Sequence, residues 1–456
     1  METNPLKQYI DLFEENRDLF MAGSASRVND LRVKAYENLH SMSLPPKGSE
    51  NYEITDLSAM LAPDYGLNPR RVSMPVNPAD SFSCRVPNMS TSLFFLFNDA
   101  FACPDNSSRR LPEGVVCGSL RDVLHKHPEI AERYGTVAEL HNPLVALNTM
   151  LTQDGFVLYV PDGVKVEKPI QLVNILQSPV PLMAPRRLLV IMGNDADAKL
   201  LVCDHTQNRE LNYLALTTIE IICGRNAKFD YYDLEESSVR TSRLWSLYAS
   251  MEEGADLLVD GITLNNGTTR NEYYVTMHGE HCNLQLLGMG IEDLDRQLDT
   301  FSLIRHLKPH CKSNELFKYT VDDEARGAFC GRIYVAPGAI KTEAYQSNRN
   351  VLGSDKARMY SKPQLEIYND DVKCSHGTAI GQFDEKQIFY MLTRGLSRDD
   401  AHKLLKQAFM ADVIAGVRLD SLRDRLTHLV EMRFSGLPID ADCASCKGLD
   451  TDTISQ

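Results

Sequence analysis

Short apolar runs separated by turn residues dominate the middle of the chain, from about residue 141 to residue 383. Aliphatic and β-branched residues fill positions 156–160, 170–175, 188–192 and 217–222. Runs of this length, rich in Val, Ile and aromatic residues and bounded by turn residues, predict strands. Few helical periods lie between them, which argues against an alternating α/β fold. We therefore expect a mainly β protein.

A small residue recurs at a fixed place between these runs. It is found at Ala198, Ala227, Ala255, Cys282, Cys311, Ala325, Ala339 and Ala357. The spacing is about 28 residues at first and later about 14, which indicates a solenoid of stacked strands with one or two strands per step. A β-sandwich with evenly spaced turns is the alternative.

Helical periodicity is confined to the two ends of the chain. Residues 1–45 carry apolar stripes at helical spacing, and a third helix is expected over 118–134. After Asp384 the period changes from 2 to 3.6. We expect a short helix that begins at Asp384-Glu385 and is stopped by Gly395, followed by a helix with Ser397 as its capping residue. We therefore predict a helical and irregular domain over 1–140, a solenoid core over 141–383, a helical domain over 384–436 and a polar tail over 437–456.

Charge and terminal pattern limit the possible partners and location. The 456 residues carry a formal net charge of −14, whereas a nucleic-acid footprint needs a clustered positive face, so neither nucleic acid nor an anionic membrane is expected. No signal-peptide pattern opens the chain, and no window holds the roughly 18 apolar residues of a membrane span. We expect a cytoplasmic protein.

Common catalytic motifs are missing from the sequence. It contains no G-x-x-x-x-G-K-[ST], G-x-S-x-G or H-E-x-x-H pattern, so the chain is not expected to hydrolyse nucleotides itself. Cys443 and Cys446 form half of a zinc site without a second pair, which favours a polar tail. Cys282 and Cys311, each after a His, fit the small corner positions of the repeat.

Cys374 and His376 form the strongest candidate pair of metal ligands in the sequence. They stand two residues apart on the last expected strand before the C-terminal helices. Strand side chains alternate between faces, so both should point the same way. Thiolate and imidazole are transition-metal ligands, which makes this pair the candidate metal and cofactor site.

The stretch Asp371-Val372-Lys373-Cys374-Ser375-His376-Gly377 resembles the end of the core shared by the SufB/SufD family of the SUF iron–sulfur cluster assembly machinery. The segments 146–148, 154–155 and 169–172 resemble the entry to the same core, and Glu50 to Thr55 resembles the N-terminal element of the SufD type. The Cys-Ser-His sequence also favours the SufD type over the SufB type.

This resemblance implies a right-handed parallel β-helix with flanking helical domains and a scaffold role without catalysis. It further implies pairing with SufB through the end of the β-helix, and binding of the SufC ATPase, which would supply ATP hydrolysis, through residues 384–436. His376 matches a family position at the SufB–SufD interface, where iron or a transient iron–sulfur cluster would be shared with SufB cysteines. No stably bound cofactor is expected, and the role of Cys374 is open.

Two other functions remain open at this stage. The chain could be the SufB-type member or a self-paired homodimeric scaffold, since an exposed strand edge can pair with itself. A polysaccharide-active β-helix enzyme is the more remote alternative, because neither an export signal nor a recurring acidic cluster is present.

Overall fold

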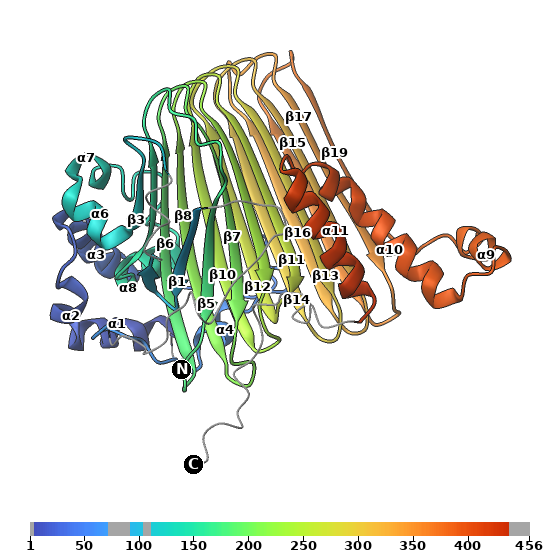
Figure 1. The fold of residues 1–456 in the computed structure, drawn as a ribbon, viewed down its shortest axis with the longest axis horizontal. Coiled ribbons are helices and arrows are strands. Elements are labelled where there is room, and N and C mark those ends of the chain that lie inside the picture. Colours follow the sequence, from blue (N-terminus) through green and yellow to red (C-terminus); the bar gives the residue numbers. More distant parts are fainter. Residues whose placement is uncertain (1–3, 72–91, 104–110, 437–456) are drawn as a thin grey trace.

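The computed structural model describes residues 4–71, 92–103 and 111–436, and its centre is a β-solenoid of about eight turns (Figure 1). Each turn contributes one strand to each of two parallel sheets, so strands two apart in sequence are neighbours. The predicted solenoid is confirmed, and the β-sandwich alternative is wrong. Helices flank this core on both its N-terminal and its C-terminal side, as expected.

The two sheets follow the chain in alternation. The first sheet contains β5 (Ile170–Leu176), β7 (Asp197–Thr206), β9 (Lys228–Glu236), β11 (Asp256–Asn265), β13 (Asn283–Glu292), β15 (Lys312–Val321), β17 (Glu343–Leu352) and β19 (Lys373–Gly381). The second sheet contains β4 (Gly155–Val160), β6 (Leu182–Met192), β8 (Tyr213–Cys223), β10 (Thr241–Met251), β12 (Thr268–Met277), β14 (Gln297–His306), β16 (Arg326–Val335) and β18 (Arg358–Ile367).

Like positions stack from turn to turn because the register is continuous. Tyr231 on β9 lies beside Val259 on β11, which lies beside Leu286 on β13. All three belong to the main apolar core, which occupies the space between the two sheets, here called the lumen. Alternate residues of each strand face this lumen, as the period of two requires.

Small residues occupy the tight corner before the strands β9, β11, β13 and β15 of the first sheet. Ala227, Ala255, Cys282 and Cys311 are fully buried there, and the residue before each of the four has a positive φ. One turn earlier, before β7, the corner residue is Ala196 and not Ala198 as predicted. Asp197, the first residue of β7, pairs with Lys228, the first residue of β9, so Ala196 is the residue that corresponds to Ala227. The halved spacing seen later in the sequence arises because Ala325 and Ala357 lie at the opposite corners, before the second sheet.

The N-terminal helices cover the outer face of the second sheet. They are α1 (Leu6–Glu15), α2 (Arg17–Met21), α3 (Ser26–Leu39), α4 (Leu57–Leu61), α6 (Leu120–Lys126), α7 (Pro128–Ala131) and α8 (Pro143–Leu151). Leu147 of α8 packs with Leu216 and Leu244, and Leu124 of α6 packs with Leu189. The strands beneath are therefore buried on both faces, which explains their continuous apolar runs.

The C-terminal helices cover the outer face of the first sheet. Val413 of α10 (Arg398–Ala415) and Leu426 of α11 (Asp420–Phe434) pack with Leu258 and Ile262 of β11. Between the two helices, the Arg418 guanidinium lies 2.8 Å from the Asp230 carboxylate. Helix α9 (Glu385–Thr393) instead projects beyond the solenoid (Figure 1).

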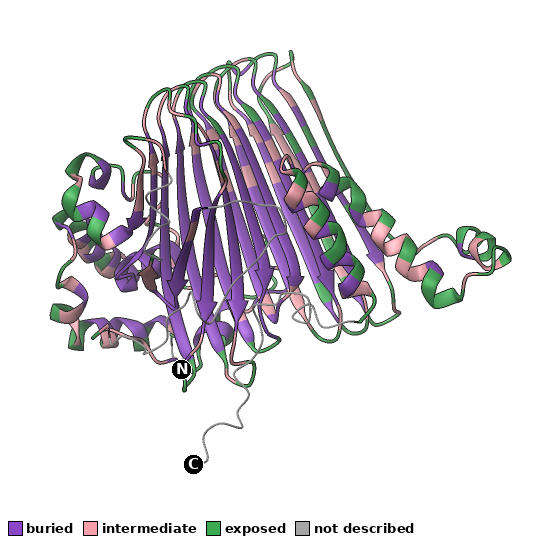
Figure 2. Ribbon diagram, viewed as in Figure 1, coloured by how far each residue is buried: buried purple, intermediate pink, exposed green. Residues whose placement is uncertain are grey.

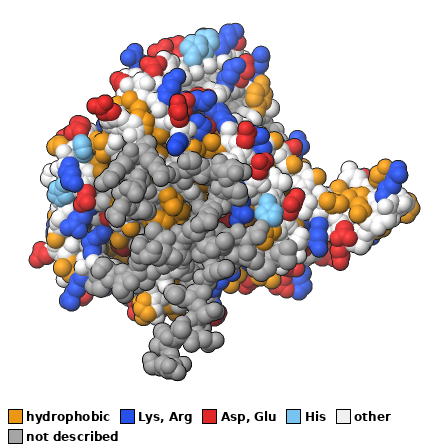
Figure 3. Space-filling view, in the orientation of Figure 1, with side chains coloured by type: hydrophobic (Ala, Val, Ile, Leu, Met, Phe, Trp, Pro, Cys, Tyr) orange, Lys and Arg blue, Asp and Glu red, His pale blue; other side chains and the backbone are white. Residues whose placement is uncertain are grey.

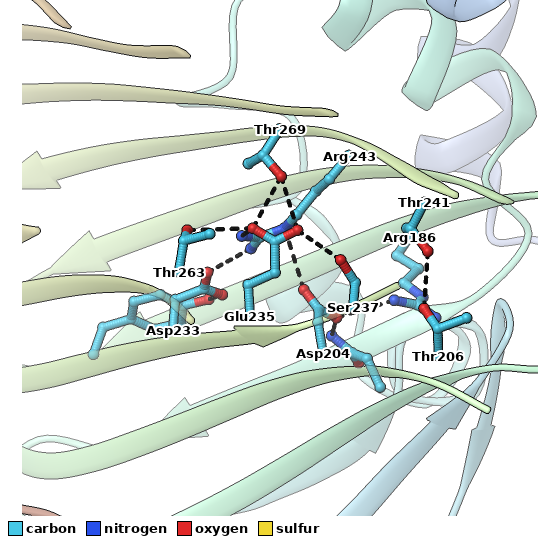
Figure 4. Close-up of polar contacts among 12 residues, drawn as sticks. Arg186, Asp204, Thr206, Asp233, Glu235, Ser237, Thr241, Arg243, Thr263 and Thr269 are labelled. Carbon is cyan, nitrogen blue, oxygen red and sulfur yellow. Dashed lines mark hydrogen bonds and ion pairs between the residues drawn. The ribbon is translucent and has the colours of Figure 1, made fainter. Parts of the chain in front are cut away.

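A network of buried charges fills one side of the lumen in the early turns (Figure 4). Arg243 on β10 lies 3.3 Å from Asp204, 2.5 Å from Asp233 and 3.3 Å from Glu235. Thr269 donates a 2.8 Å hydrogen bond to Glu235. Buried charges are tolerated only when they are paired and hydrogen-bonded. The network therefore has a structural explanation that requires no ligand.

Candidate functional site at the open end of the solenoid

The two ends of the solenoid are finished differently. At the N-terminal end, β1 (Ser92–Phe97) continues the first sheet and is followed by the antiparallel β2 (Ala100–Ala102), while the antiparallel β3 (Val116–Ser119) closes the second sheet. At the other end, β18 and β19 are the last strands of their sheets in the described part of the chain. Their outer edges therefore offer backbone N–H and C=O groups to another molecule.

Exposure rises abruptly at this last turn, here called the open turn (β18, β19 and residues 368–372). Nearly every residue of β19 is exposed, whereas β8 is buried throughout (Figure 2). Large apolar side chains are exposed here as well, with Tyr368 at 59% and Ile380 at 45%. An open strand edge next to exposed apolar side chains is typical of a protein-binding surface.

Cys374 and His376 both lie on β19 and share one face of it. Cys374 pairs with Ala344 and His376 with Gln346, and both partners face the lumen and are buried. The predicted common orientation is therefore confirmed, and both side chains lie on the lumen face of the open turn. His376 is exposed there because this lumen opens to solvent above the last turn.

Cys374 is in a more enclosed position than His376. It is half-buried and packs against the cluster of Ile333, Val335 and Ala344. Burial raises the pKa of its thiol, which disfavours the thiolate in the isolated chain. Cys374 thus has a packing role that His376 lacks.

Polar groups continue along the same face of β19. Thr378 donates a 2.7 Å hydrogen bond to Ser361 on β18, and Ser361 donates one of 2.7 Å to Asn348 on β17. At the open end, this part of the lumen is therefore lined by polar side chains. Periodicity analysis did not single out these residues, because it reports strands but not how far each strand lies from the end.

The segment of residues 50–55, here called the strap, ties the N-terminal region to the later turns. Tyr52 donates a 2.7 Å hydrogen bond to Glu272 on β12, and Thr55 donates one of 2.6 Å to Asp299 on β14. Glu50 pairs with Arg332 on β16 at 2.9 Å, and Glu53 pairs with Lys362 on β18. The strap therefore crosses successive turns and reaches the open turn.

Helix α9 carries a second exposed apolar surface. Phe389 is 67% and Tyr390 58% exposed, and Figure 3 shows hydrophobic side chains gathered where α9 projects from the molecule. The predicted start and stop of this helix are confirmed, because Asp384 caps its N-terminus and Gly395 follows its end with a φ of +89°. Ser397 caps α10, also as predicted.

The remaining cysteine and histidine candidates do not form a site. The His281 and His310 rings stack at 4.9 Å on the exterior, while Cys282 and Cys311 fill the buried corner. Within residues 4–71, 92–103 and 111–436, no group of three or more His, Cys, Asp or Glu side chains is arranged to hold a metal ion. Cys443 and Cys446, with the predicted polar tail, lie outside the described residues.

None of the helices in these same ranges combines the length and the apolar character needed to span a bilayer.

Comparison with known proteins agrees with the geometry. The family model described as "SUF system FeS cluster assembly, SufBD core domain" matches residues 175–409, and the one described as "SufBD protein N-terminal region" matches residues 3–172.

Individual relatives show the same pattern over much of the chain. An iron–sulfur cluster assembly SufBD family protein of Synechocystis is 29% identical over 413 residues, which is 88% of this chain and 90% of the relative. SufD of Escherichia coli is 34% identical over 41% of this chain and 44% of its own length, and SufD of Bacillus subtilis 26% over 70% and 74%. The chain belongs to the SufB/SufD family of iron–sulfur cluster assembly proteins of the SUF system.

Proposed function

We propose that the chain is a non-catalytic, SufD-type scaffold subunit that pairs with a SufB-type subunit through the open turn. The iron or nascent iron–sulfur cluster is the cargo of this pair and would form at the seam between the subunits. His376 would supply a ligand to it, next to cysteines of the partner. The observation that carries this proposal is an exposed imidazole on the one uncapped end of the described solenoid.

The chemistry of the open turn suits this role. A neutral imidazole can bind iron, and thiolates hold iron–sulfur clusters. One histidine and one half-buried cysteine are too few ligands for a cluster, so a second chain must contribute. A partner seated on the edges of β18 and β19 would also satisfy their open backbone groups and cover Tyr368 and Ile380.

We further propose that residues 384–436 bind the SufC ATPase. The exposed aromatic residues of α9 are the candidate contact, and α10 and α11 are anchored on the first sheet by Arg418. Movement of two SufC subunits during ATP hydrolysis would then pull on both helical domains. Because α10 and α11 are packed on the sheet that ends in β19, such a pull would strain the seam.

The ligand role is tested by substituting His376 in the chain co-expressed with its SufB-type and SufC partners. H376A should leave folding and co-purification intact, because its side chain is exposed, yet lower iron and sulfide per complex by about tenfold. C374A should have a milder effect if Cys374 mainly packs. H310A, which removes an exposed histidine from a solenoid corner, is the matched control. Normal iron and sulfide content in H376A would remove this residue from the site.

A second candidate is a homodimer formed through the same surface. The unpaired edge of β19 favours it, because such an edge can pair with a copy of itself. Size measurement with and without the co-expressed SufB-type chain separates the two cases. A heterodimer that forms at the expense of the homodimer supports the main proposal, whereas a homodimer that persists unchanged favours the self-paired scaffold.

A further inference from the structure

A row of polar side chains leads from the interior of the lumen to His376. In the first sheet, Leu286 on β13 lies beside Glu315 on β15, Glu315 beside Gln346 on β17, and Gln346 beside His376 on β19. In the earlier turns this row is apolar, with Tyr231 as its only hydroxyl-bearing member in the stretch from β9 to β13. The row becomes polar only in the last three turns.

Glu315 is a buried carboxyl group with neutral partners. Its side chain is inaccessible to solvent and accepts hydrogen bonds from Ser302 at 2.6 Å and from the Gln346 Nε2 at 3.1 Å. Burial raises the pKa of Glu315 to about 7. A carboxylate held here without a cation costs free energy, which a core packed for stability alone would avoid by using an apolar residue.

Gln346 is held in one orientation by this carboxyl group. A carboxylate only accepts hydrogen bonds, so the amide must present Nε2 to Glu315 and therefore its oxygen to the other side. The Gln346 Oε1 is buried and has no hydrogen-bond partner within the described residues. Gly331 on β16 leaves room for this arrangement, because a Cβ there would lie 2.3 Å from the Gln346 Nε2.

We propose that Glu315 and Gln346 are positioning residues for His376. Glu315 fixes the Gln346 amide. The Gln346 Oε1, which has no partner within the described residues, would accept a hydrogen bond from one imidazole N–H of His376 on the neighbouring strand once the exposed ring turns toward it. The second ring nitrogen then carries the lone pair and is available at the seam. Metal-binding histidines commonly have their tautomer fixed by such an acceptor. The role assigned here rests on the proposed ligand function of His376.

The tautomer of His376 can be measured directly in the full-length chain alone, without iron or partner. Nitrogen-15 NMR of labelled histidine at pH 8 gives the ratio of the two neutral tautomers, and the His376 signal is assigned by its loss in H376A. In the native chain this ratio should differ at least threefold from that of a free blocked histidine. E315L and Q346L should each bring it within about twofold of the free value.

E315Q is the conservative control, because a glutamine oxygen can still accept from the Gln346 Nε2. E315Q should keep the native tautomer ratio. That result would show that the change in E315L comes from the lost hydrogen-bond acceptor and not from a general loss of packing. Thermal unfolding identifies variants that fail to fold, and Q346L then provides the independent test. A native ratio equal to that of free histidine, or one that E315L and Q346L leave unchanged, overturns the inference.

The outcome separates this inference from the proposed function. Cluster content of the co-expressed complex should fall in E315L, and the E315L/H376A double variant should be no lower than H376A alone, since Glu315 acts through His376. If H376A has normal cluster content while the tautomer still depends on Glu315, the ligand role fails and the positioning contact stands. If E315L lowers cluster content equally in the H376A background, Glu315 does not act through His376.

Discussion

Single residues of this molecule differ in how far they are buried and in whether their surroundings favour or disfavour a charge. His376 is exposed on a strand edge and makes no contact that the fold needs, whereas the buried Glu315 and Asp260 lie in surroundings that disfavour their charge. Asp260 is the sharper case. It faces outward from β11 between Tyr232 and Leu287, under the C-terminal helices, and neither carboxylate oxygen has a hydrogen-bond partner within the described residues.

Asp260 should make stability fall as pH rises. Burial raises its pKa to about 8, against about 4 in an unfolded chain, so the folded protein favours the protonated form. The stability gained from this preference is complete below about pH 4 and is lost as pH rises through 8. D260N should therefore flatten the pH dependence of the free energy of unfolding and add about 2 kcal/mol at pH 8.5.

Urea denaturation at pH 5.5 and pH 8.5 measures this effect. The matched control is D424N, which changes an exposed carboxyl group on α11 and should leave the difference between the two pH values as it is in the native chain. An equal pH dependence in the native chain and in D260N would contradict the assignment of Asp260.

The sequence predicted part of the site at this scale. Alternation along a strand was enough to place Cys374 and His376 on one face, and the resemblance named His376. Glu315 and Gln346 could not be found in the same way, because they are 61 and 30 positions from His376 (376 minus 315 and 376 minus 346). Their alignment depends on the lengths of the intervening turns, and one turn near residue 339 is longer than its neighbours.

Among the elements, the C-terminal helices α9, α10 and α11 have different roles. Helices α10 and α11 bury the apolar outer face of the first sheet, so deleting residues from Asp384 onward would uncover Leu258, Ile262 and Leu287. After such a deletion, a loss of SufC binding could not be distinguished from a loss of folding. Helix α9 projects away from this face and carries its aromatic residues in solvent, so it can be altered on its own.

Replacing the exposed aromatic residues of α9 should separate SufC binding from folding. The F389S/Y390S double variant should keep its free energy of unfolding within about 0.5 kcal/mol, because both side chains are largely in solvent. Its affinity for the SufC ATPase should fall at least about tenfold, as expected when aromatic anchors are removed from an interface. Titration calorimetry with purified SufC measures both the affinity and any change in stoichiometry.

The control for this variant is V239S, which changes a residue that is also about half exposed but lies in a turn of the solenoid. Native affinity in F389S/Y390S would place the SufC contact elsewhere than on α9. Helix boundaries in this region were well predicted, because Asp384, Gly395 and Ser397 are local signals. The packing of α10 and α11 on the first sheet was not predicted, because contacts between residues far apart in the sequence produce no periodic pattern.

At the scale of the whole molecule, the solenoid is closed at one end and open at the other. The strands β1, β2 and β3 and the N-terminal helices finish the first turn, while β18 and β19 end in solvent. The strap couples the two regions, because it pairs with Lys362 on β18. The repeat in the sequence predicted the stacked strands, but a repeat alone does not tell which end remains uncovered.

The central claim is that the open turn is covered by a SufB-type partner, and amide hydrogen exchange tests it most directly. Exchange is compared between the isolated chain and its complex with the SufB-type subunit. The account predicts that peptides covering Lys373–Gly381 and Arg358–Ile367 become strongly protected in the complex, while those of β8 and β10, already buried, do not change. Unchanged exchange in β18 and β19, with new protection on another surface, would contradict it.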